Sequence, residues 1–205
     1  MTATRKEVAT QTRNKYQWRV VDIVVASVIG VASGVIFWAW GLAWNALSLP
    51  LAFLPGLSGL LTGGWLFAGV LGALIVRKPG AAFFTEVVAA FVSMVIGTQW
   101  GWATMVSGVI QGLGIELVFA IFLYTNWRLY VAIIAGAAGG AALGINENLV
   151  YYAANDSTFK AIYLASAITS GVILAGLLSW LAVRGLAATG ALSRFAAGRE
   201  QTQRV

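Results

Sequence analysis

Three carboxylates, Glu86, Glu116 and Glu147, lie inside long stretches of almost uninterrupted apolar and small residues. Placing a carboxylate inside a lipid bilayer costs a few kcal/mol of insertion free energy unless the group faces the interior of a helix bundle, pairs with another group or is protonated. A structural hydrogen bond to a neighbouring helix would account for any single one of them. Three such costs in one short chain indicate a polar ligand site within a membrane-embedded bundle.

Amide and aromatic side chains accompany these acids along the chain. Asn146 and Asn148 flank Glu147, and Tyr151 follows one helical turn later on the same face. The other candidate binding residues are polar or aromatic positions in separate stretches, namely Trp65, Gln99, Trp100 and Gln111.

These side-chain types suit one class of ligand. A carboxylate neutralises a cation, and an amide reads hydrogen-bond donors and acceptors on a heterocycle. A Trp ring stacks on flat groups and favours a cation over its face, for roughly 0.5–2 kcal/mol each. The pattern therefore indicates a ligand that is small, planar, rich in nitrogen and cationic.

The distribution of tryptophan supports a role beyond membrane anchoring. An interfacial aromatic belt is expected at both membrane surfaces, whereas most of the nine Trp residues fall in the half that we expect to face outward. Those residues are Trp38, Trp40, Trp44, Trp65, Trp100 and Trp102.

The elements that must position these residues are predicted to be transmembrane helices. Of the 205 residues, 60% are hydrophobic and only 10% are charged, which is typical of a membrane protein. A spanning helix needs about 20 mostly apolar residues. Such segments occur at roughly 20–45, 57–76, 80–97, 103–124, 129–153 and 161–185. We therefore expect an all-α membrane protein with a six-transmembrane-helix bundle, a transmembrane domain at 20–185, an N-terminal segment at 1–19 and a C-terminal tail at 186–205.

The placement of Lys and Arg predicts the orientation of this bundle. Cytoplasmic loops and termini carry an excess of these residues. If the six segments alternate in direction, twelve of the thirteen basic residues fall on one side, and Lys160 alone falls on the other. Both termini are therefore expected to be cytoplasmic, and the basic residues mark helix ends rather than a nucleic-acid patch.

Several classes of function are disfavoured by what the chain lacks. With no Cys and no His, it offers no disulfide framework, no imidazole base and no common metal-ligand cluster. No Lys follows a Gly, so there is no P-loop for ATP. We accordingly expect no catalytic residues, no metal site, no cofactor and no nucleic-acid partner.

Small residues form stripes with a spacing of four along three of the predicted helices. Because small residues let helix backbones approach closely in lipid, tight packing explains most of them. The stripes are Ala26, Gly30 and Gly34, then Gly64, Ala68 and Gly72, and finally Gly136, Gly140 and Gly144.

Two blocks of the sequence carry a resemblance to a known family. The stretches RKPGAAFFTEVVAAFVSMVIGTQWG (77–101) and GVIQGLGIELVF (108–119) resemble the YkoE-type substrate-binding (S) component of energy-coupling factor (ECF) transporters. The predicted pattern of six helices with both ends inside matches that family over nearly the whole chain.

The resemblance implies a vitamin-capture subunit of an ABC importer in the cell membrane. It implies that the chain binds thiamine or its hydroxymethylpyrimidine precursor from outside, and works with a transmembrane coupling (T) protein and two cytoplasmic ATPase subunits. Within the two blocks, Glu86, Gln99, Gln111 and Glu116 carry over as candidate site residues. In such families a small-xxx-small stripe on the first helix contacts the coupling protein, and the Ala26–Gly30–Gly34 stripe matches that pattern.

One rival function remains open at this stage. The three carboxylates could instead form a proton relay in a stand-alone carrier of a small cationic heterocycle. Such a carrier would move its substrate without any ATPase partner.

Overall fold

The computed structural model describes residues 16–193 and 195–198. Most of the predicted N-terminal segment lies outside the described residues, as does the end of the predicted C-terminal tail. Seven of the basic residues that predict the orientation also lie outside the described residues. They are Arg5, Lys6, Arg13, Lys15, Arg194, Arg199 and Arg204.

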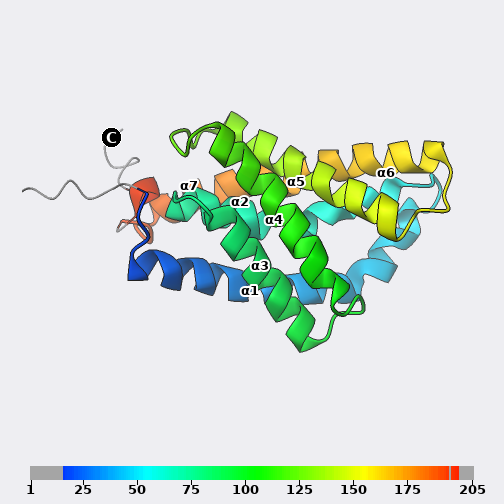
Figure 1. The fold of residues 1–205 in the computed structure, drawn as a ribbon, viewed down its shortest axis with the longest axis horizontal. Coiled ribbons are helices and arrows are strands. Elements are labelled where there is room, and N and C mark those ends of the chain that lie inside the picture. Colours follow the sequence, from blue (N-terminus) through cyan, green and yellow to red (C-terminus); the bar gives the residue numbers. More distant parts are fainter. Residues whose placement is uncertain (1–15, 194, 199–205) are drawn as a thin grey trace, which may run out of the picture.

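All secondary-structure elements of the described residues are helices (Figure 1). The elements, in chain order, are α1 (Val20–Ser48), η1 (Leu49–Leu51), η2 (Leu57–Trp65), α2 (Phe67–Val76), α3 (Ala81–Ile96), α4 (Ala103–Ile121), α5 (Leu129–Val150), α6 (Ser157–Ser170), η3 (Gly171–Leu177) and α7 (Leu178–Ala188).

Five helical runs within the described residues are long and apolar enough to span a membrane. They are Val20–Leu51, Leu57–Val76, Ala103–Ile121, Leu129–Val150 and Ser157–Ala188. The remaining predicted segment corresponds to α3, a shorter apolar helix of 16 residues. The expected all-α membrane fold is thus confirmed, and the last helical run extends to Ala188, beyond the predicted boundary at 185.

The molecule is an elongated bundle with two distinct ends (Figure 1). The start of α1 and the end of α7 lie at one end, which we call the basic end because Arg19, Arg77, Arg128 and Arg184 belong to it. The loop between α5 and α6, which precedes Lys160, lies at the opposite end. This arrangement agrees with the predicted separation of basic residues along the bundle.

A 3₁₀-helix opens the second run, and its glycines approach α6 closely. A Cβ on Gly59 would lie 2.6 Å from the Tyr163 carbonyl oxygen, and one on Gly63 would lie 2.5 Å from the Ser170 carbonyl oxygen. Ser170 Oγ donates to the Leu60 carbonyl at 2.6 Å and accepts from the Gly63 N–H at 2.9 Å. These contacts hold the tighter helix in place and set the position of Trp65 at its end.

Close glycine packing also joins α5 to the last helical run. A Cβ on Gly136 would lie 2.7 Å from the Gly176 backbone nitrogen, and Gly140 lies directly against the backbone of Ala167. Gly171 and Gly176 belong to η3, a π-helical stretch between α6 and α7. The expectation of tight packing along the Gly136–Gly140–Gly144 stripe is confirmed.

The stripe on α1 is buried against α3, which corrects the expectation that it docks a partner. Ala26 has no exposed surface. A Cβ on Gly30 would lie 2.7 Å from Val88 Cβ, and one on Gly34 would lie 2.6 Å from Val92 Cβ. The glycines therefore bring α1 and α3 together inside this bundle, and the exposed residues of α1 lie on its other side.

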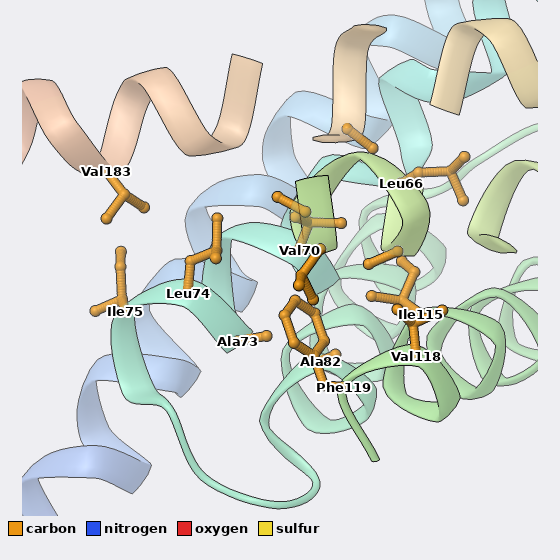
Figure 2. Packing of buried hydrophobic residues seen from close by; sticks show 14 of the residues in the cluster. Leu66, Val70, Ala73, Leu74, Ile75, Ala82, Ile115, Val118, Phe119 and Val183 are labelled. Carbon is orange, nitrogen blue, oxygen red and sulfur yellow. The ribbon is translucent and has the colours of Figure 1, made fainter. Parts of the chain in front are cut away.

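Buried aliphatic and aromatic side chains from α2 and α4 form the centre of the bundle (Figure 2). Leu66, just before α2, and Val70 and Leu74 within it lie in this cluster with Ile115 and Phe119 of α4. This apolar centre separates the two ends of the bundle, each of which contains a pocket.

Candidate functional site

A partly open pocket lies between α1, α3, α4, α5 and the junction of η2 with α2. Its empty volume is about 480 Å³, open space at its mouth included. Of the binding residues expected from the sequence, it brings together Trp65, Trp100, Gln111, Glu147 and Tyr151.

Glu147 is the carboxylate of this pocket, and α6 holds it in place. The buried Tyr163 hydroxyl donates a hydrogen bond to Glu147 Oε2. Tyr163 is itself packed by Tyr152 and Phe159, whose ring centroids lie 4.8 and 5.9 Å from its own. Because its donor is immobilised by these rings, Glu147 is presented to the pocket in a defined orientation.

Gln111 connects the pocket to the second carboxylate. In the amide orientation that satisfies both neighbours, Gln111 Nε2 donates to Glu86 Oε1 and to the Trp65 carbonyl, each at 3.2 Å. Glu86 Oε2 accepts from the Gly69 N–H at 2.8 Å, in the first turn of α2, where backbone donors lack helical partners. Glu86 is fully buried and lies behind Gln111, so it orients the amide instead of lining the pocket.

Three tryptophans form a cluster beside the pocket. The Trp65 ring centroid lies 5.2 Å from those of Trp44 and Trp100, and the latter two are 6.3 Å apart. Trp65 Nε1 donates to the Phe37 carbonyl at 3.0 Å, which fixes its ring. The cluster therefore offers aromatic surface that is already in place for a flat ligand.

Besides Glu86, three further residues expected to bind the ligand do not line the pocket, namely Glu116, Gln99 and Asn148. Glu116 accepts hydrogen bonds from the backbone N–H groups of Gly80, Ala82 and Phe83, at 2.6, 2.9 and 3.2 Å. It caps the start of α3 and does not line the pocket, because the direction of α4 carries it toward the basic end.

Gln99 and Asn148 also make structural contacts outside the pocket lining. Gln99 Nε2 donates to the Gly41 carbonyl at 3.3 Å and ties the α3–α4 turn to α1. Asn148 Nδ2 donates to the Lys160 carbonyl at 3.0 Å, because its side of α5 faces α6 rather than α4. Asn146 bonds to Ser107 Oγ at 3.3 Å, so of the two amides beside Glu147 it is the one that contacts a pocket residue.

Hydroxyl groups were missed by sequence reasoning. Ser93, Thr98, Thr104 and Ser107 line the pocket. Thr104 Oγ1 is buried and has no hydrogen-bond partner among the described residues. Thr104, Ser107 and Gln111 lie at i, i+3 and i+7, so extending one helical face from Gln111 would have found two of them.

The fold and the pocket together define a polytopic membrane protein that holds a small-molecule site between its helices. Comparison with known proteins identifies the family. The model of a family described as ABC-type cobalt transport system, permease component, matches residues 21–142. The "Putative HMP/thiamine permease protein YkoE" of Bacillus subtilis (strain 168) is 36% identical over 190 residues, covering 89% of this chain and 92% of that protein.

A solved structure agrees with these matches. It is described as the crystal structure of an S-component of ECF transporter, and it has a TM-score of 0.86 at 34% identity, covering 92% of this chain and 95% of that one. The chain therefore belongs to the YkoE-type S components of ECF vitamin transporters. It is a multi-pass protein of the cytoplasmic membrane, and its family and fold are those of transporter components rather than enzymes.

Proposed function

We propose that this chain captures thiamine, or its hydroxymethylpyrimidine precursor, in the pocket between Trp65, Trp100, Gln111 and Glu147. One observation carries the proposal. A carboxylate oriented by Tyr163 lines the same pocket as a fixed tryptophan cluster. The name of the Bacillus subtilis relative supports the same class of ligand.

The chemistry of thiamine matches this set of side chains. Its thiazolium is cationic and complements Glu147, and both of its rings are flat enough to stack on Trp100 or Trp65. Its aminopyrimidine carries a donor and ring acceptors, for which Gln111, Thr104 and Ser107 supply partners. Specificity then arises because an analogue that lacks one partner leaves a buried polar group unpaired.

The proposal includes the arrangement in the membrane. The helices form six spans with both termini in the cytoplasm, and residues 20–185 form the membrane domain between an N-terminal segment and a C-terminal tail. The short α3 counts as a span, and the pocket then opens outward. The captured ligand passes inward when a transmembrane coupling protein and two ATPase subunits supply the energy of ATP hydrolysis.

Titration of intrinsic tryptophan fluorescence tests the binding step. Saturable quenching by thiamine is expected, because the tryptophan cluster borders the pocket. A parallel titration with hydroxymethylpyrimidine shows which half of the molecule is recognised. If neither compound changes the fluorescence or binds by calorimetry, the vitamin assignment is refuted.

Transport in proteoliposomes separates this function from a proton-coupled carrier. The purified chain alone, given a pH gradient and labelled thiamine, is expected to accumulate none. Uptake is expected when the coupling protein and the ATPases are reconstituted with it and ATP is enclosed. Rapid uptake by the chain alone would favour the carrier.

A further inference from the structure

A second pocket lies at the basic end, between α2, α5 and α7. Its empty volume is about 650 Å³, open space included. Its wall contains three arginines that come from separate parts of the chain, namely Arg77 after α2, Arg128 before α5 and Arg184 on α7. The fold, rather than one basic run of sequence, therefore gathers these charges.

Tryptophan faces position two of the guanidinium groups. Arg184 Cζ lies 4.7 Å from the centroid of the Trp180 ring, and Arg77 Cζ lies 5.7 Å from that of Trp127. Trp127 in turn stacks on Phe119 of the core, with centroids 5.2 Å apart. The basic wall is thus anchored on the apolar centre of the bundle.

Two of the three arginines of this pocket are not neutralised by an ion pair within the described part of the chain. Among the described residues, an ion pair joins Arg19 to Asp22, neither of which lines this pocket. Arg128 and Arg184 are exposed, and no described carboxylate forms an ion pair with either of them. Like charges gathered in one concavity raise the local potential and attract an anion.

The remaining walls and the position of the pocket indicate what kind of anion fits. Leu74 and Val183 provide buried apolar surface beside the arginines. The pocket lies where apolar α2 ends and apolar α5 begins, which is where the ends of membrane-spanning helices are expected to meet the membrane interface. A planar guanidinium binds a phosphate in a bidentate manner, and basic pockets between transmembrane helices bind anionic headgroups.

We propose that this pocket binds a phosphate-bearing anion, and that the anion is the headgroup of an anionic lipid with the first carbons of its acyl chains against Leu74 and Val183. Free phosphate carries the same charge but has no apolar group that could contact Leu74 and Val183. The proposal is independent of the ligand in the first pocket.

Native mass spectrometry of the full chain in neutral detergent tests it. Short-chain phosphatidylglycerol is compared with phosphatidylcholine of the same chain length and with inorganic phosphate. Phosphatidylglycerol is expected to bind saturably and more tightly than the other two. Arg128→Gln and Arg184→Gln are each expected to weaken its binding about fivefold, the usual effect of one basic residue at a membrane surface.

Lys160→Gln is the matched control, because it removes the same charge at the opposite end of the molecule. It is expected to leave phosphatidylglycerol binding unchanged. Each variant should elute as the wild type does and unfold at the same temperature without lipid.

Four results would overturn the proposal. The first is equal binding of the two lipids, and the second is an equal loss of binding in Lys160→Gln. The third is inorganic phosphate that binds as tightly as phosphatidylglycerol, which would assign the pocket to a free anion. Binding of a soluble acidic peptide without phosphatidylglycerol binding would likewise assign it to a protein partner and refute the lipid.

Discussion

At the scale of single residues, the three membrane carboxylates have separate environments. Glu147 lines the first pocket, Glu86 orients Gln111 from behind, and Glu116 caps a helix. Only Glu147 is placed to meet the charge of a ligand directly. Among the described residues, no hydrogen bond joins any two of these three carboxylates.

Glu147→Gln is expected to weaken thiamine binding at least about tenfold, because hydrogen bonds and contacts to a charged group are worth about 1.5–3 kcal/mol. The amide still accepts the Tyr163 hydrogen bond, so the fold should persist. Calorimetric titration measures the change. Glu116→Gln is the matched control, and a similar loss of affinity in that variant would contradict the assignment of Glu147.

Trp100 supplies aromatic surface at the pocket, whereas the nearby Trp102 is 75% exposed and does not line it. Trp100→Leu is expected to reduce thiamine affinity by about 2- to 30-fold, the range of a cation–π contact. Trp102→Leu should leave the affinity unchanged. Equal effects of the two substitutions would show that the tryptophans act through the membrane interface instead of the site.

At the scale of elements, Glu116 joins α4 to the start of α3. Its two oxygens satisfy three backbone donors that have no partner within the helix. Glu116→Ala should therefore destabilise the protein by about 1–3 kcal/mol, the penalty of leaving buried donors unpaired. The measurement is the thermal unfolding midpoint in detergent. An unchanged midpoint would show that the cap does not stabilise α3.

The contact between α5 and η3 depends on glycine at specific positions. Gly136→Ala should destabilise the bundle by about 1–3 kcal/mol, because the new methyl group meets backbone atoms that cannot move aside. Gly185→Ala provides the opposite control, since no atom lies within 4 Å of a Cβ placed there. It should stabilise α7 by up to about 1 kcal/mol. Thermal unfolding midpoints that shift in the same direction for both variants would contradict this interpretation.

At the scale of the whole molecule, the proposed orientation can be tested directly because the chain contains no cysteine. Single cysteines introduced as Ala154→Cys, in the α5–α6 loop, and Ala188→Cys, at the end of α7, lie at opposite ends of the bundle. A membrane-impermeant maleimide should label the first in intact cells and the second only after permeabilisation. The reverse pattern would invert the proposed topology.

The sequence by itself determined the class of protein and the position of its helices. Long apolar runs must form helices in lipid, since every backbone polar group there needs an internal partner. Apolar length is a local property, so the predicted segments lie close to the observed helices. The same reasoning singled out Glu147, Gln111, Trp65 and Trp100, because a polar group amid apolar residues, or an excess of tryptophan on one side, is visible without any contact information.

The tertiary structure decided which faces of the helices meet. Glu116 and Gln111 share α4, yet one caps α3 and the other lines the pocket, because a rise of 1.5 Å per residue separates them along the axis. The Ala26–Gly30–Gly34 stripe has the spacing expected for a docking face, but α3 covers it. Arg128 and Arg184 are 56 positions apart in the chain and line one pocket only because the start of α5 lies beside α7. Such contacts depend on packing between distant segments, which the composition and spacing of one segment do not encode.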